Sequence, residues 1–413
     1  MTKSLNSYVT KDKSIDVSIY DKRISLVIVL HLCILACKNM LANTSDFFMS
    51  INSFLNTAIL IFFLGIYVYA VFNAKLLVRI NRASYIVLVL IVAFIGFSCM
   101  ADPKLFVSDV FPYDYVKSQF RTFIIYSLPL FLAFSALRNT DHLLKLLFKA
   151  TPILFAFSTF AFFMSTISFS ELNEYSMAYG NALMLVAGLL LFKYRDNGKL
   201  STLLAFLMTV FYIVISGSRG PVLCIAVLTL VALLTSKSGM GKMVWIGVVI
   251  VAGFALIFWY SDILNLIMRL MEALGLSSRT LNFLIDGSIT YDSGRGEIYD
   301  NLIKEINKSP LLGLGAFGGH SAVGLPHSTY LDIFANFGYV FGSAFIVIIF
   351  CQIYKILRRE KGSSLGKIFL MFATIVVVRG FFGGSLWTEK ELWMLFGIMI
   401  NYNKYDKKAS IKG

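Results

Sequence analysis

The chain alternates long apolar segments with short polar ones from end to end. Most of the apolar runs have about the length that an α-helix needs to cross a bilayer. No interval between them is long enough for a separate soluble domain. We count about twelve runs, so the pattern predicts an all-α polytopic integral membrane protein with about twelve transmembrane helices. The predicted spans lie near residues 24–42, 49–73, 84–100, 122–137, 151–168, 178–193, 200–217, 220–236, 243–261, 328–351, 366–386 and 389–402.

The spacing of these runs divides the chain into three parts. Residues 1–261 hold the first nine predicted spans with short loops, and residues 328–413 hold the last three with a polar tail. Between them, residues 262–327 form the longest polar segment. Most of the 37 lysines and arginines fall in alternate loops and in both tails. Because short cytoplasmic loops collect such residues, we expect both termini in the cytoplasm and the 262–327 segment outside.

Composition supports the membrane assignment and narrows the function. Hydrophobic residues make up 58% of the chain, the mean hydropathy is +0.76 and the net charge is +14. Cationic loops facing anionic lipid account for this charge, so we expect membrane lipid and no nucleic acid as a partner. The five cysteines lie in or beside predicted spans without the spacing of a zinc or redox site. The first apolar run follows a long polar start without a small-residue cleavage site, which indicates a signal anchor.

The 262–327 segment is predicted to be a large, partly helical extracytoplasmic loop. In "DILNLIMRLMEAL" (262–274) the apolar residues mark one face of a helix lying on the membrane surface. In "SGRGEIYDNLIKEINKSPLLGLGAFG" (293–318) a second helical face is formed by Ile298, Leu302, Ile303 and Ile306, and Pro310 cannot continue that helix. Acidic residues balance the basic ones here, so an anion site would depend on placement and not on bulk charge.

Two junctions between polar and apolar sequence carry candidate chemistry. Arg219 lies in "ISGSRGPVL" (215–223) between two spans, and His327 lies in "GLPHSTYLDIFANFGYVFG" (324–342), where the loop enters the next span. An arginine at such a depth either reaches for lipid headgroups or holds a phosphate with its planar fork. The histidine either packs at the start of a span capped by Ser328 or acts as a base near neutral pH.

Three motifs in fixed order resemble the O-antigen ligase and polymerase superfamily, the WaaL-type ligases and Wzy-type polymerases. They are "SGSRGP", "GRGEIYDNLIKEINKSPLLGLGAFG" and "PHSTYLDIFANFGYVFG". The resemblance implies a membrane glycosyltransferase of the GT-C type at the outer face of the bacterial cytoplasmic membrane. It implies a substrate glycan carried by undecaprenyl pyrophosphate, and neither cofactor nor metal. It also leaves room for a chain-length regulator protein as a partner. Ser328 follows the histidine where the family often has asparagine.

The resemblance transfers three catalytic candidates to this chain, His327, Arg219 and Arg295. The histidine would activate the acceptor hydroxyl, and the arginines would stabilise the departing pyrophosphate. Further substrate-binding candidates are Arg269, Arg279, Arg379, Tyr291 and Tyr330. Arg379 is notable because it lies in "VVVRGFFGG", inside a predicted span, where a charge is costly unless it faces a wet cavity.

Four functions remain open from sequence. The leading one is a polymerase that joins lipid-linked oligosaccharide units into an O-antigen or capsule-type polysaccharide. A ligase that moves the finished glycan onto lipid A-core would use the same donor chemistry. A flippase for lipid-linked sugars would place ionisable residues across many spans, which this sequence does not. A purely structural membrane protein would leave the three motifs without a purpose.

Overall fold

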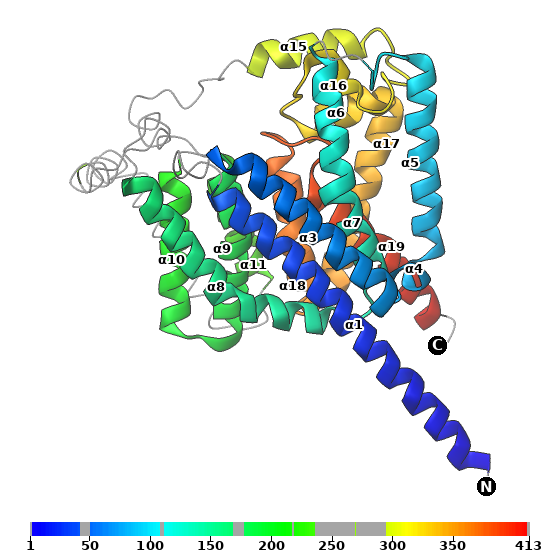
Figure 1. Ribbon diagram of the computed structural model, residues 1–413, viewed down its shortest axis with the longest axis vertical. Coiled ribbons are helices and arrows are strands. Elements are labelled where there is room, and N and C mark those ends of the chain that lie inside the picture. The colour runs from blue at the N-terminus through cyan, green and yellow to red at the C-terminus, as the bar shows by residue number, and fades with distance from the viewer. Residues whose placement is uncertain are drawn as a thin grey trace.

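The computed structural model describes residues 2–41, 50–107, 111–167, 177–216, 219–235, 269 and 295–410. Every regular element among these residues is a helix (Figure 1). The first half comprises α1 (Thr2–Leu41), α3 (Asn52–Asn73), α4 (Leu76–Arg79), α5 (Arg82–Ala101), α6 (Tyr113–Thr122), the π-helix η1 (Phe123–Ser127), α7 (Leu128–Ala136) and α8 (Thr140–Ile167). The second half comprises α9 (Met177–Asn197), α10 (Leu200–Ile215), α11 (Arg219–Leu234), α15 (Arg295–Ile306), α16 (Gly318–Val323), α17 (Thr329–Arg359), α18 (Ser364–Arg379) and α19 (Lys390–Ser410).

Seven helical segments of the described chain are long and apolar enough to cross a membrane, which confirms a polytopic membrane protein. They are Ile19–Leu41, Asn52–Asn73, Arg82–Ala101, Tyr113–Ala136, Thr140–Met164, Met177–Asn197 and Thr329–Arg359. The helices α10 and α11 are apolar but shorter. The predicted span 243–261 and most of the 262–274 helix lie outside the described residues. The total of twelve spans and the GT-C type stay predictions.

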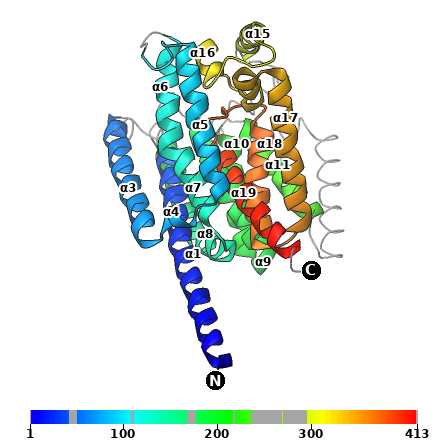
Figure 2. The same cartoon turned by 90° about the vertical axis from the view of Figure 1, so that its right-hand side faces the viewer.

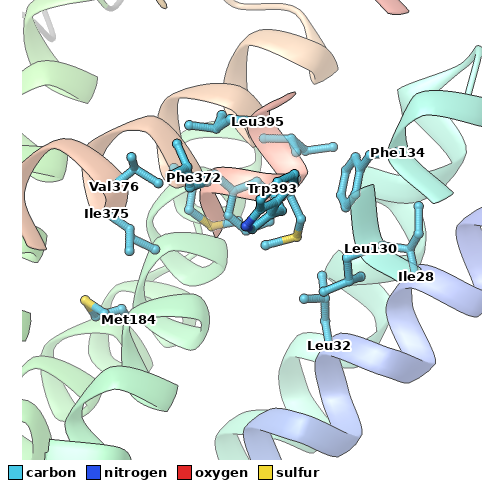
Figure 3. Close-up of a cluster of buried hydrophobic side chains, with 14 of the residues drawn as sticks. Ile28, Leu32, Leu130, Phe134, Met184, Phe372, Ile375, Val376, Trp393 and Leu395 are labelled. Atoms are coloured by element: carbon cyan, nitrogen blue, oxygen red, sulfur yellow. The ribbon is translucent and has the colours of Figure 1, made fainter. Parts of the chain in front are cut away.

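The helices pack around one large apolar core. Helix α19 packs against α7, α1 against α8, and α11 against α18. Figure 3 shows Ile28 and Leu32 of α1 in the same cluster as Phe134 of α7, Phe372 of α18 and Trp393 of α19. The outward faces of α3 and α5 are different, because large apolar side chains such as those of Phe72 and Val92 remain exposed there. Lipid tails can cover such surfaces, so they need no protein partner.

The bundle has two distinct ends. Both termini lie at one end, and α15 and α16 lie at the other, above α5, α6 and α17 (Figures 1 and 2). This arrangement agrees with a chain whose two termini are on the same side of a membrane. We call the end that carries α15 and α16 the outer end, after the orientation expected from the lysine and arginine pattern.

A break in α17 fastens the glycine-rich segment 309–316 to the bundle. Gly338 has φ +71° and ψ 177° inside this helix, a backbone conformation that a residue with a Cβ would rarely adopt. The break leaves the carbonyl of Ala335 and the amide of Tyr339 without partners inside the helix, and both form hydrogen bonds with segment 309–316. The amide of Leu314 donates to the carbonyl of Ala335 at 2.6 Å, and the amide of Tyr339 donates to that of Pro310 at 2.7 Å. The outer segment is therefore held by hydrogen bonds to a spanning helix.

The helix predicted within 293–318 is present as α15. Leu302 and Ile306 on its predicted apolar face are fully buried against Ala335 of α17, whereas Ile303 on the same predicted face is exposed. The helix ends before Pro310, as expected for a residue without an amide hydrogen. Packing on α17 thus sets the position of Arg295 at the first turn of α15.

Candidate functional site

The start of α17 places His327 at the outer end of the bundle. Ser328 caps the helix by accepting a hydrogen bond from the amide of Leu331 at 3.3 Å, as its residue type predicts. His327 comes directly before this cap in a left-handed conformation, with φ +53°. Its side chain is half-buried. The cap at Ser328 explains why the helix starts here, but the imidazole of His327 takes no part in it.

Two hydrogen bonds join α15 to this junction and to the loop between α18 and α19. The hydroxyl of Tyr299 donates to the backbone carbonyl of His327 at 3.1 Å. Nη1 of Arg295 donates to the carbonyl of Phe382 at 2.9 Å. These bonds bring Arg295 and His327, which are 32 residues apart in the sequence, to the same part of the fold. Sequence reasoning gave Tyr299 no role, although it lies one turn after Arg295 in the second motif.

The surroundings of His327 favour its neutral form. Burial lowers the pKa of the imidazole, and the positive charge of Arg295 lowers it further. A histidine with a pKa below the usual 6.5 is mostly neutral at pH 7 and can accept a proton. Such a group is suited to act as a base beside an arginine that can bind an anion.

The loop 380–389 forms one wall of the site and is held by buried polar contacts. Both carboxylate oxygens of Asp332 accept hydrogen bonds, one from the amide of Leu386 at 2.8 Å and one from Nδ2 of Asn336 at 3.0 Å. The indole of Trp387 donates to Oδ1 of Asn336 at 2.9 Å. The first two turns of α17 therefore position this loop.

His320 of α16 is tied to the same loop. Its side chain is fully buried, with Nε2 at 3.0 Å from Oγ of Ser385 and Nδ1 at 2.6 Å from the carbonyl of Gly324. Because both ring nitrogens are engaged, this histidine has a structural role. His31 is also buried, stacked on Phe63 at 4.1 Å within the bundle, as its position in the first span predicts.

Arg379 is the last residue of α18. The predicted span 366–386 extended past it, but the helix ends at Arg379 and a loop follows. Its Nη1 contacts Oε1 of Glu389 at 3.0 Å and Oε2 of Glu391 at 3.9 Å. The charge is therefore paired. The polar run "WTEKEL" (387–392) is the sequence signal for this cluster, although the predicted span 389–402 includes its charged residues.

The remaining candidates are placed only in part. Arg219 is the first residue of α11, at the turn after α10, and its side chain is outside the described part. Arg279 and Tyr291 also lie outside it. Arg269 is exposed. Tyr330 is half-buried, and its hydroxyl donates to the carbonyl of Val377 at 3.0 Å, so it packs α17 against α18.

Within the described ranges, no group of three or more histidine, cysteine, aspartate or glutamate side chains is arranged to hold a metal ion. The ionisable groups that the described residues bring to the site include Arg295, His327, His320, Asp332 and the Arg379 cluster. Their chemistry is that of hydrogen bonding, proton transfer and anion binding.

Comparison with known proteins shows a similarity in the region that holds the site. Residues 204–347 match the family model described as O-antigen ligase. The match runs from α10 to α17 and includes Arg219, Arg295 and His327. No curated protein and no solved structure matches the chain significantly. Residues 204–347 are therefore similar to the O-antigen ligase family, in agreement with the three motifs.

Proposed function

We propose that this protein is a glycosyltransferase that polymerises oligosaccharide units carried by undecaprenyl pyrophosphate at the outer face of the bacterial inner membrane. Both termini are in the cytoplasm in this proposal, and the growing chain is an O-antigen or capsule-type polysaccharide. The donor and the acceptor are both lipid-linked, and no nucleotide sugar or metal takes part.

One observation carries the proposal. Arg295, whose guanidinium can bind an anion, and His327, whose imidazole can act as a base, lie close together at the outer end of the helix bundle. Their segments are joined by the 3.1 Å hydrogen bond from Tyr299 to the carbonyl of His327. A substrate whose reacting bond lies between lipid pyrophosphate and sugar needs both groups at headgroup depth. The match to a family of this chemistry supports the same assignment.

The reaction assigns a role to each group. The acceptor hydroxyl attacks the anomeric carbon of the donor sugar, a new glycosidic bond forms, and the bond between that carbon and the pyrophosphate oxygen breaks. His327 takes the proton from the hydroxyl. Arg295 and Arg219 bind the undecaprenyl pyrophosphate that leaves, since a guanidinium stays charged and offers paired donors to phosphate oxygens. In this proposal Nη1 of Arg295 keeps its hydrogen bond to the carbonyl of Phe382, and the other guanidinium nitrogens bind the pyrophosphate.

A ligase is the second candidate, and the description of the matching family favours it. It would transfer the glycan from the same carrier to lipid A-core. Donor binding and activation would be unchanged, so the same three residues would act. The difference lies in the acceptor.

Reconstitution separates the two functions. The purified protein is placed in liposomes with undecaprenyl-pyrophosphate oligosaccharide alone, and the lipid-linked products are separated on a gel. A ladder of longer chains supports the polymerase. Transfer only after lipid A-core is added supports the ligase instead. Absence of transfer under both conditions, with a correctly folded protein, contradicts the proposal.

A further inference from the structure

A second polar site lies at the outer end of the bundle, between α1, α9, α18 and α19. These helices enclose a cavity of about 220 Å³. Its lining includes Asn39, Asn181, Arg379, Lys390 and Glu391, above an apolar floor. At about 30 Å³ for each water molecule, the cavity has room for roughly seven waters. It is therefore large enough for one sugar residue.

Some polar atoms around this cavity have no hydrogen-bond partner in the described part of the chain. They include Oδ1 of Asn181 and Nε of Arg379, which are both shielded from solvent. The first is an acceptor and the second is a donor. Buried polar groups are normally satisfied, and because both side chains line the cavity, a small rotation of either one would bring its unpaired atom to a partner there. A ligand with both hydroxyl donors and hydroxyl acceptors would satisfy both.

The charges in the cavity favour an uncharged ligand. Arg379 pairs with Glu389 at 3.0 Å, and Lys390 pairs with Glu391 at 2.8 Å. Each cation that lines the cavity is thus paired with an acid, Arg379 with a glutamate outside the lining, which leaves little net charge to attract a pyrophosphate. Carboxylates beside arginine and amide groups suit sugar hydroxyls, which both donate and accept. The side chains of Arg379 and Lys390 are 17% and 22% exposed, so a ligand can reach them.

The cavity also adjoins the site that holds His327. Arg379 lines the cavity, and the next residue, Gly380, accepts hydrogen bonds from Oγ of Ser328 at 3.1 Å and from the amide of Thr329 at 3.0 Å. The end of α18 and the start of the loop after it therefore lie between the two sites, which are neighbours in the fold.

We propose that this cavity binds one neutral sugar residue of the glycan substrate, next to the reacting unit. The proposal rests on the proposed function, because it assumes that a glycan is the substrate. Asn181 and Arg379 hold hydroxyls of that sugar, and Glu391 accepts from another. The cavity acts in binding and not in proton transfer, so its loss raises KM and leaves kcat unchanged.

Two substitutions on α9 test this without altering the ion pairs. Asn181→Leu removes the amide at nearly constant size, and Ala178→Leu adds bulk to the lining. Ala226→Leu on α11 is the matched control, because it adds the same bulk at an exposed position. KM and kcat are measured in liposomes with the lipid-linked oligosaccharide. Thermal protection of the purified protein is measured with the free repeat-unit oligosaccharide released from that lipid and, separately, with inorganic pyrophosphate.

We expect both α9 variants to raise KM about tenfold at unchanged kcat, as loss of one or two hydrogen bonds implies. The oligosaccharide should protect the wild type and the control but not the α9 variants. Unchanged KM and protection in the variants would overturn the sugar site while the proposed function stands. Protection by pyrophosphate that the α9 variants abolish would identify an anion site and also overturn it. An inactive wild type that the sugar still protects would contradict the proposed function alone.

Discussion

Substitution of Asp332 by asparagine tests how the loop 380–389 is held against α17. Both oxygens of Asp332 accept hydrogen bonds, from the amide of Leu386 and from Nδ2 of Asn336, and the residue is fully buried. An asparagine keeps one acceptor oxygen and turns an NH₂ group toward the other donor. One hydrogen bond is then lost, and two donors face each other without solvent.

The cost follows from these contacts. A hydrogen bond to a charged group contributes about 1.5–3 kcal/mol, and a buried donor left unpaired costs about 1–3 kcal/mol. Because these two costs partly overlap, we expect Asp332→Asn to destabilise the protein by about 2–4 kcal/mol. The loop should also move from its position, so Arg295 loses the carbonyl of Phe382 and glycan transfer falls.

Thermal unfolding in detergent and transfer in liposomes measure the two effects. Asp300→Asn is the matched control, since Asp300 lies on the exposed face of α15. The control should melt and react like the wild type. If Asp332→Asn does so as well, the loop does not depend on this carboxylate, and our account of the site wall is wrong.

Three further predictions concern the junction itself. Burial and Arg295 lower the pKa of His327, so the neutral base persists as pH falls and the transfer rate should decline only below pH 6.5. In Arg295→Gln this decline should move to higher pH. Identical pH–rate profiles would contradict the effect of Arg295 on the pKa of His327. Ser328→Ala should lower stability by about 1–2 kcal/mol through loss of the helix cap and of the hydrogen bond to the carbonyl of Gly380, measured as a lower melting temperature than that of Ser321→Ala. Arg219→Lys should impair transfer despite its charge, because a lysine lacks the planar fork, and a normal rate would leave Arg219 as a headgroup anchor.

Local sequence patterns predicted those parts of the structure that depend on nearby residues. The apolar face of α15, its end before Pro310 and the cap at Ser328 follow from spacing and residue type within one or two turns. The position of His31 within the core followed from its place in an apolar run. The catalytic candidates came from the resemblance, and the structure brings Arg295 and His327 together.

Other features depend on segments that are distant in sequence. The break at Gly338 lies within an apolar run that periodicity reads as a continuous helix. It is stable because Pro310 and Leu314 use the freed backbone groups. The contacts of Asp332 with the loop after α18 could not be read from either segment alone. The same holds for the cavity near Asn181, which four helices enclose.

The central claim is that His327 removes the proton from the acceptor hydroxyl at the outer end of the bundle. The most direct test is the initial rate of lipid-linked chain extension in liposomes for His327→Ala, beside His142→Ala at the start of α8, far along the chain from the site. We expect the first variant to lose about 10²–10⁴-fold in rate with an unchanged melting temperature, and the second to match the wild type. An undiminished rate in a folded His327→Ala protein would contradict the account.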